Sequence, residues 1–241
     1  MTKLRNTAAL TGLATLMLAA APQASADDLS AKVGISNNYI WRGLTQTENG
    51  TAVSGGIDYA ADSGFYAGTW VSNVSYAPGD VFSYEHDIYF GYSGEFGDGI
   101  GYDFGYLYYN YDKEAEFDFG EIYGSLSIDA FTFGLNIVTN TEADEGPGQD
   151  FGFGETFYAY ADYSVTVRED VELGFHVGYH DGDFSEAFNG VPEGYLDYAL
   201  SLSKDGFTFA ITGTDLDDPG PDNLDNDEIK FVVSYAVDFA L

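Results

Sequence analysis

Residues 157–180 read FYAYADYSVTVREDVELGFHVGYH, which is two runs of alternating residues joined by a short polar turn, Arg168–Asp170. In both runs every second residue is apolar or alanine, from Phe157 to Val167 and from Val171 to Tyr179. Most of the intervening positions carry small, polar or charged side chains. A period of two places each apolar set on one face of a strand. The stretch therefore predicts a β-hairpin with one apolar face.

The same alternation recurs along the rest of the chain, and beyond the first 26 residues no segment shows a sustained helical period. Further sets that share one phase, and are mostly apolar, are Val33, Ile35, Asn37, Tyr39 and Trp41; alternate residues from 100 to 108; alternate residues from 131 to 137; and alternate residues from 229 to 241. The phase is ambiguous at 65–74 and 117–128. Counting the runs between turns predicts about twelve strands, an even number.

The connections between these runs alternate in length. Short polar turns are expected at 61–64, 97–99, 129–130, 168–170 and 204–206, and longer acidic or Gly/Pro-bearing loops near 43–50, 76–82, 112–116, 142–154, 181–193 and 216–227. Short turns on one side and long loops on the other are typical of a transmembrane β-barrel with both termini in the periplasm. We therefore predict an all-β fold, an antiparallel barrel of about 12 strands with short periplasmic turns and acidic extracellular loops. A soluble β-sandwich would carry more Lys, Thr and Arg on its outer face.

The first 26 residues have the features of a cleaved signal peptide. Lys3 and Arg5 precede an apolar run from Ala8 to Ala21, and Ala24-Ser25-Ala26 provides a cleavage site before Asp27. The sequence thus predicts a signal peptide at 1–26 and one barrel domain at 27–241, exported to the outer membrane. The expected partners are outer-membrane lipid and lipopolysaccharide, with periplasmic chaperones and the barrel-assembly machinery during biogenesis.

Composition excludes several functional classes. The chain has 40 acidic and 8 basic residues and a net charge of −32, which excludes binding to nucleic acid through phosphate neutralisation. It contains no cysteine, so disulfides, thiolate zinc sites and cysteine nucleophiles are excluded. His176 and His180 share a strand face but lie roughly 13 Å apart, too far to bind one metal. We expect no metal, no cofactor and no enzymatic activity; Ser83 beside His86 is the only pair resembling catalytic residues, and no orienting third group is evident.

Alternation also predicts which side chains line the barrel interior. The bases among them are expected on the first and last strands, where they would form a basic seam opposite an acidic wall. Carboxylates inside a low-dielectric tube concentrate cations, so the sequence predicts a passive channel for small solutes or ions that prefers cations. A plugged structural or adhesive barrel with cation-binding acidic loops remains the alternative. The predicted pore-lining residues are Lys32, Arg42, Asp58, Glu85, Asp87, Tyr89, Asp103, Tyr158, Tyr160, Asp162, Glu172, His176, Asp197 and Lys230.

Several blocks in the first half of the mature chain resemble the TorF-like porin family. In order, they are NYIWRGLTQT at 38–47, GGIDY at 55–59, GFYAGTWVSNV at 64–74, EHDIYFGY at 85–92 and FGEIY at 119–123. The resemblance implies an outer-membrane porin barrel with poorly defined substrates. Two departures are Asn38, where an acid commonly precedes the tyrosine, and the ending Phe239-Ala240-Leu241, where barrels usually end in an aromatic residue.

Overall fold

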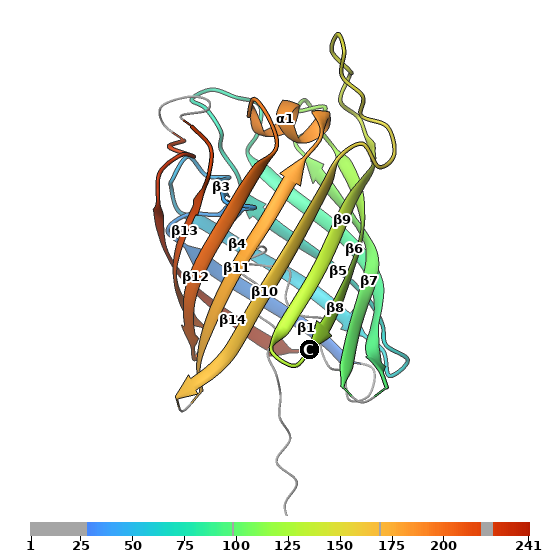
Figure 1. Cartoon of the computed structure of the whole chain (residues 1–241), viewed down its shortest axis with the longest axis vertical. Coiled ribbons are helices and arrows are strands. Elements are labelled where there is room, and N and C mark those ends of the chain that lie inside the picture. The colour runs from blue at the N-terminus through green and yellow to red at the C-terminus, as the bar shows by residue number, and fades with distance from the viewer. Residues whose placement is uncertain (1–27, 98, 169, 218–223) are drawn as a thin grey trace, which may run out of the picture.

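The computed structural model describes residues 28–97, 99–168, 170–217 and 224–241, which form a closed antiparallel barrel (Figure 1). The predicted signal peptide lies outside the described residues. Twelve strands close the barrel, as the sequence predicts, and a separate two-stranded hairpin comprises β2 (Ile40–Trp41) and β3 (Leu44–Thr45). The barrel strands are β1 (Asp28–Ser36), β4 (Ala52–Ala60), β5 (Phe65–Asn73), β6 (Tyr84–Phe96), β7 (Ile100–Tyr111), β8 (Phe119–Ile128), β9 (Phe131–Thr141), β10 (Phe157–Arg168), β11 (Val171–Asp181), β12 (Tyr195–Lys204), β13 (Phe207–Thr214) and β14 (Lys230–Ala240).

The barrel closes because the first strand pairs on both sides. Val33 of β1 lies opposite Gly55 of β4 and also opposite Val237 of β14. All other neighbouring strands, from β4 to β14, also follow one another in the sequence and pair antiparallel. Closure leaves no strand edge with unpaired backbone groups, which is the requirement for crossing hydrocarbon with strands.

The outer surface of the barrel is apolar, and the last strand shows this most clearly. Phe231 and Phe239 are 70% and 50% exposed, and Val233 is also exposed, whereas the intervening Val232 is buried. The predicted phase of this strand is therefore confirmed. The exposed apolar band is the surface that such a barrel presents to lipid.

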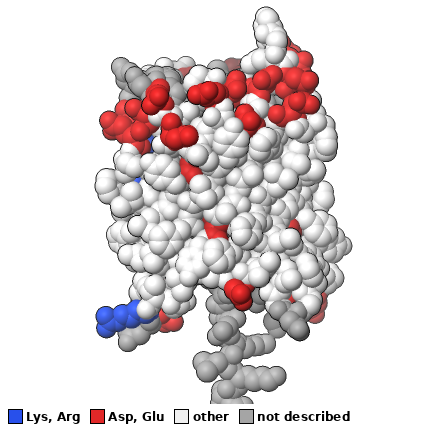
Figure 2. Space-filling model, viewed as in Figure 1, with Lys and Arg blue, Asp and Glu red and all other residues white. Residues whose placement is uncertain are grey.

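The two ends of the barrel differ in chemistry. Tight turns join the strands at the end where the chain terminates, and Asp129 and Asp205 occupy them with positive φ angles of 54° and 51°. The long loops lie at the opposite end, where acidic side chains crowd the rim (Figure 2). By analogy with outer-membrane barrels we call these the periplasmic and extracellular ends.

Two local features differ from the prediction. β1 ends at Ser36, so Tyr39 and Trp41 do not continue its lipid-facing phase but are 6% and 4% exposed inside the barrel. The chain turns inward there because Arg42 and Gly43, with φ angles of 48° and 82°, join β2 to β3 through a two-residue turn of the I′ kind. The loop before β12 also contains a short helix, α1 (Asp183–Asn189), ended by Gly190 in the left-handed conformation. Within the described ranges, no helix has the length and apolarity needed to cross a membrane.

Candidate functional site

The most distinctive feature of the interior is the lumen hairpin, which we define as residues 38–47. All of these residues are buried, although they belong to a loop between two barrel strands. Gly43 at its tip lies so close to Asp197 of β12 that an added Cβ would be 2.6 Å from the Asp197 Cβ atom and 2.7 Å from Thr214 Cγ2. The tip therefore contacts the barrel wall across the lumen and leaves no room for a larger residue.

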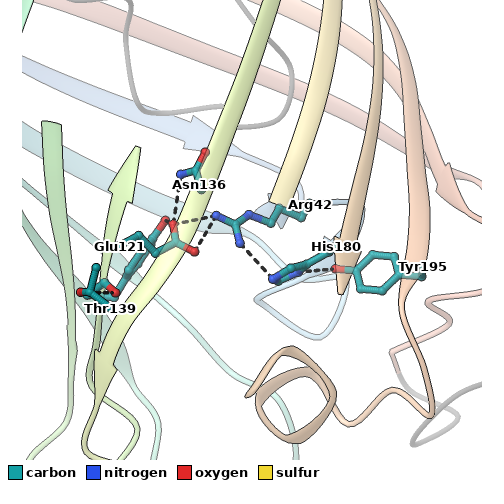
Figure 3. A network of polar contacts seen from close by, with 8 residues as sticks. Arg42, Glu121, Asn136, Thr139, His180 and Tyr195 are labelled. Atoms are coloured by element: carbon teal, nitrogen blue, oxygen red, sulfur yellow. Dashed lines mark hydrogen bonds and ion pairs between the residues drawn. The ribbon is translucent and has the colours of Figure 1, made fainter. Parts of the chain in front are cut away.

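A buried ion pair anchors the hairpin tip. The Arg42 guanidinium donates through Nη2 to both carboxylate oxygens of Glu121 on β8, at 2.9 and 2.7 Å, and its Nη1 donates to His180 Nε2 on β11 at 3.0 Å (Figure 3). The Arg42 and Glu121 side chains are only 3% and 1% exposed. Asn136 and Tyr109 also donate to Glu121, at 3.1 and 3.3 Å. Such charge-assisted bonds in a dry setting fix the position of the tip strongly.

A second anchor attaches the base of the hairpin to another part of the wall. The Tyr39 hydroxyl donates to Glu85 Oε1 on β6 at 2.7 Å, and the Tyr111 hydroxyl donates to Glu85 Oε2 at the same distance. Tyr39 also packs edge-on against Trp70, with ring centroids 5.4 Å apart. The hairpin is thus bound to strands on different sides of the barrel.

Aromatic packing fills the extracellular half of the lumen around the hairpin. The Trp41 ring contacts Tyr109, Phe119 and Phe188, with centroid distances of 5.9, 6.2 and 5.9 Å. The ring of Phe184 in α1 packs on Phe119 at 4.9 Å. Tyr109, Phe119 and Phe184 are each no more than 2% exposed. The lumen is therefore closed by packed side chains at this level.

The periplasmic half is polar and partly open. Lys32 Nζ on β1 lies 3.1 Å from Asp58 Oδ2 on β4, and these side chains retain 12% and 14% exposure. The Tyr89 hydroxyl donates to Asp58 as well. Nearby, the Tyr66 hydroxyl donates to Asp103 at 2.5 Å. Charged and hydroxyl groups therefore line the lumen below the packed region.

Two inward tyrosines, Tyr89 and Tyr158, lie against the barrel wall. An added Cβ at Gly68 would collide with the Tyr89 ring, and one at Gly178 would collide with Tyr158. Each ring therefore lies over a glycine of the neighbouring strand. The rings lie along the wall instead of projecting across the lumen.

His176 on β11 is enclosed by acidic side chains. Its Nδ1 atom is 2.6 Å from Asp162 Oδ1, and its Nε2 atom is 3.0 Å from Asp197 Oδ1 and 2.8 Å from the Tyr158 hydroxyl. Because each ring nitrogen faces a carboxylate oxygen, the geometry suits a ring that donates from both nitrogens. The second oxygen of Asp197 is buried and has no hydrogen-bond partner among the described residues.

The predicted pore-lining residues lie on inward positions, with one exception. Arg42 was expected on the first strand, but it lies at the tip of the lumen hairpin and contacts β8 and β11. The residues that alternate inward on strands are Lys32, Asp58, Glu85, Asp87, Tyr89, Asp103, Tyr158, Tyr160, Asp162, Glu172, His176, Asp197 and Lys230. Glu85 and Asp87 are sealed in the packed half, at 2% and 3% exposure.

The predicted basic seam is wrong. Lys230 begins β14 at the extracellular end, and its Nζ atom donates to the carbonyls of Leu224 and Asp225, both at 2.7 Å, and to Asn49 Oδ1 at 3.0 Å. Lys32 lies opposite Asp238, toward the periplasmic end. Arg42, Lys32 and Lys230 therefore lie at different heights along the barrel axis, because Arg42 belongs to the hairpin and Lys230 holds an extracellular loop.

Sequence reasoning missed Glu121, the contact of His180 with Arg42, and the hairpin itself. Glu121 shares an inward phase with Phe119 and Tyr123, but the ambiguous strand phase at 117–128 obscured it. The signal for the hairpin was the Arg42-Gly43 pair, since a glycine after a polar residue favours a two-residue turn.

The side chains of Ser83 and His86 bind different partners. The Ser83 hydroxyl donates to Asp112 at 2.5 Å, whereas the His86 ring contacts the Thr69 hydroxyl at 2.7 Å. In the part of the chain that the structure describes, no group of three or more His, Cys, Asp or Glu side chains could hold a metal ion.

The sequence matches the model of a known protein family. A family model described as a bacterial protein of unknown function (Gcw_chp) matches residues 20–238. The chain belongs to this family. No curated protein matches the chain. Because the matching family model is Gcw_chp, the resemblance to the TorF-like family stays a prediction.

Solved structures similar to this member of the Gcw_chp family include porins. A KdgM porin has a TM-score of 0.53 at 10% identity, with 88% of this chain and 99% of that chain covered. A NanC porin has a TM-score of 0.53 at 13% identity, covering 88% and 100%. A second KdgM structure, in complex with disordered oligogalacturonate, has a TM-score of 0.51 at 9% identity, covering 89% and 99%. At these identities the likeness shows a shared porin-type barrel fold.

Proposed function

We propose that this protein is a porin-like channel of the outer membrane that passes small cations in preference to anions, and that the lumen hairpin closes its extracellular half. The proposed ion preference rests on the charged side chains that face the lumen in the periplasmic half of the barrel. There Asp58, Asp103 and Asp162 face the lumen, and Lys32 and His176 are the neighbouring basic groups.

Electrostatics supports this preference. A low-dielectric wall focuses the field of its charges into the lumen and raises the local concentration of counterions. The acidic extracellular rim adds a field of the same sign (Figure 2). Cations are therefore attracted at both ends of the path, and anions are repelled.

Passage requires the hairpin to move, because its residues are packed between the walls. Two polar anchors hold the hairpin to the barrel strands, Arg42 with Glu121 and Tyr39 with Glu85. The strands that carry these anchors are held independently by the barrel ladders. Release of the hairpin would therefore open the lumen without unfolding the barrel.

The proposal includes an outer-membrane location reached through the predicted signal peptide at 1–26. It includes lipid and lipopolysaccharide as surroundings, the assembly machinery and chaperones as transient partners, and no enzymatic activity. The resemblance to the TorF-like family and the likeness to porin barrels support this proposal.

Reversal potentials across a KCl gradient in planar bilayers test the ion preference. A variant with the lumen hairpin replaced by a short Gly/Ser linker supplies the open channel. We expect a cation-selective potential that weakens as the salt concentration rises, because the Debye length shrinks from roughly 10 Å at 0.1 M to about 3 Å at 1 M. Adding Asp58→Asn and Asp103→Asn should move the potential toward zero. The matched control, Asp217→Asn with Asp227→Asn in an extracellular loop, should move it less; anion preference, or equal shifts, would contradict the proposal.

A second candidate is a plugged structural or adhesive barrel whose acidic loops bind cations. The packed extracellular half of the lumen and the crowded acidic rim favour it (Figure 2). If divalent cations bridge the loop carboxylates, chelation should increase protease cleavage in loop 142–156 while the barrel stays intact. Equal cleavage with calcium and with chelator would remove this candidate.

A further inference from the structure

A cavity of about 260 Å³ opens at the extracellular mouth, above the lumen hairpin. Its walls come from five segments that are distant in sequence: the hairpin, loop 74–83, loop 112–118, the region of α1, and Leu224 with Asn226 before β14. Four aromatic side chains line it, namely Tyr76, Phe82, Phe117 and Phe188. Each of these side chains is half-buried, so it is held by packing but not sealed.

The four rings form a closed series of neighbours. Centroid distances are 5.0 Å from Tyr76 to Phe82, 6.2 Å from Phe82 to Phe117, 5.9 Å from Phe117 to Phe188 and 6.3 Å from Phe188 back to Tyr76. The angles between ring planes run from 49° to 85°, so the rings do not collapse into a flat stack. Rings spaced in this way can each lie within about 6 Å of one bound cation.

The charge around the cavity has one sign. Among the described lining residues, Asp80 is the charged one, and the others are apolar or neutral polar. Three backbone amides hold its carboxylate in place: Tyr76 and Ala77 donate to Oδ2 at 2.8 Å, and Phe82 donates to Oδ1 at 3.1 Å. The surrounding rim is crowded with acidic side chains (Figure 2). An anionic ligand would be repelled here, and a neutral one would gain nothing from the field.

We propose that this mouth cavity binds a small organic cation, of the kind that carries a quaternary or alkylated ammonium group. Aromatic walls attract such a group through the negative faces of their rings, and its methyl groups bury apolar surface at the same time. An inorganic cation would lose more hydration than the rings replace, whereas an alkylated ammonium is weakly hydrated. The cavity is slightly smaller than typical pockets for drug-sized ligands, which suits a compact ligand of this class.

The site involves the lumen hairpin directly. Gln46 of the hairpin lines the cavity, and its Oε1 atom accepts a hydrogen bond from the Tyr76 hydroxyl at 2.7 Å. A ligand in the cavity would therefore contact the element that closes the lumen. Binding itself does not depend on the channel proposal, because the cavity exists whether or not the hairpin moves.

Isothermal titration of the purified full-length barrel in a non-ionic detergent tests the proposal, with choline as the probe. The comparison ligand is the neutral isostere of choline in which carbon replaces the nitrogen. We expect choline to bind and the isostere to bind at least tenfold more weakly, with choline affinity falling as salt rises. Equal affinities would show an uncharged apolar pocket, and no choline binding would show no site; either result overturns the proposal.

Aromatic-to-leucine variants locate the site. Phe82→Leu and Phe188→Leu keep apolar bulk but remove the ring, and each should weaken choline binding about fivefold without changing the affinity of the isostere. Phe90→Leu is the matched control, since Phe90 is 51% exposed on the outer face and does not line the mouth cavity. The heat-modifiable folded band on gels verifies that each variant is folded. Choline binding that is insensitive to both cavity variants would place the site elsewhere and overturn the assignment.

Discussion

Replacing Glu121 by glutamine should release the lumen hairpin while leaving the barrel folded. The substitution keeps the size and one carbonyl oxygen of the side chain but removes its charge. Arg42, which is 3% exposed, would then be a buried cation without its carboxylate. His180 cannot replace that carboxylate, because it meets the guanidinium as a neutral acceptor.

The expected magnitude follows from the burial of this pair. Removing one partner of a buried ion pair is typically destabilising by about 3–5 kcal/mol, and the remaining amide hydrogen bonds place Glu121→Gln at about 3 kcal/mol. A loss of about 3 kcal/mol from the free energy that holds the hairpin in place raises the population of the released hairpin roughly a hundredfold. Replacing both partners, as Arg42→Met with Glu121→Leu, should restore much of the loss because no charge is left uncompensated.

Tryptophan fluorescence reports this release selectively. The chain has two tryptophans: Trp41 lies in the hairpin, and Trp70 packs against the hairpin residue Tyr39. Both are buried, at 4% and 3% exposure. In Glu121→Gln we expect a red-shifted emission, greater quenching by acrylamide and a lower urea midpoint for the tryptophan change, with the folded band on gels retained. Emission and quenching identical to the wild type would refute the claim that this pair holds the hairpin.

Three further predictions concern other parts of the molecule. Gly43→Ala should displace the hairpin tip, since a Cβ there meets Asp197 at 2.6 Å and φ is 82°; acrylamide quenching of tryptophan should rise, and unchanged quenching would show that the tip tolerates the methyl group. Val233→Lys places a charge on the lipid face at a cost of about 2–4 kcal/mol and should abolish the heat-modifiable band, whereas Asp238→Lys near the periplasmic end should not. Partial burial raises the pKa of the Asp112 carboxyl, but hydrogen bonds from Ser83 and Tyr84 outweigh it and hold this pKa below its usual value. The attachment is therefore complete above about pH 4 and is lost as the pH falls through the lowered pKa. The protection of the Ser83 amide from hydrogen exchange, measured against its intrinsic rate at each pH, should therefore fall in acid, and Asp112→Asn should abolish that pH dependence.

Alternation was sufficient to predict the barrel, because every barrel strand turns one set of alternate residues toward the outer surface and the other set toward the lumen. The lipid-facing phase of β14 and the twelve-strand count follow from it directly. The alternation of turn and loop lengths likewise predicted which end of the barrel carries the acidic loops.

Alternation failed where the chain leaves the wall. Tyr39 and Trp41 fit a lipid-facing phase as well as an inward one, since both environments are apolar. What separates them is the pairing of Arg42 with Glu121, which are 79 residues apart in the sequence. The local sequence cannot reveal a contact at that separation, and so neither the hairpin nor its closure of the lumen could be predicted. The short helix α1 is likewise defined by packing of Phe184 and Phe188 over the hairpin side of the lumen, not by a helical repeat.

Single-channel conductance in planar bilayers decides whether this porin-type barrel is closed by its own lumen hairpin. The wild-type protein should give rare, brief or no current steps, whereas the variant with residues 38–47 replaced by a short Gly/Ser linker should give steady steps of uniform size. Steady steps of equal conductance in both proteins would contradict closure by the hairpin, and no steps from the folded linker variant would contradict the channel itself.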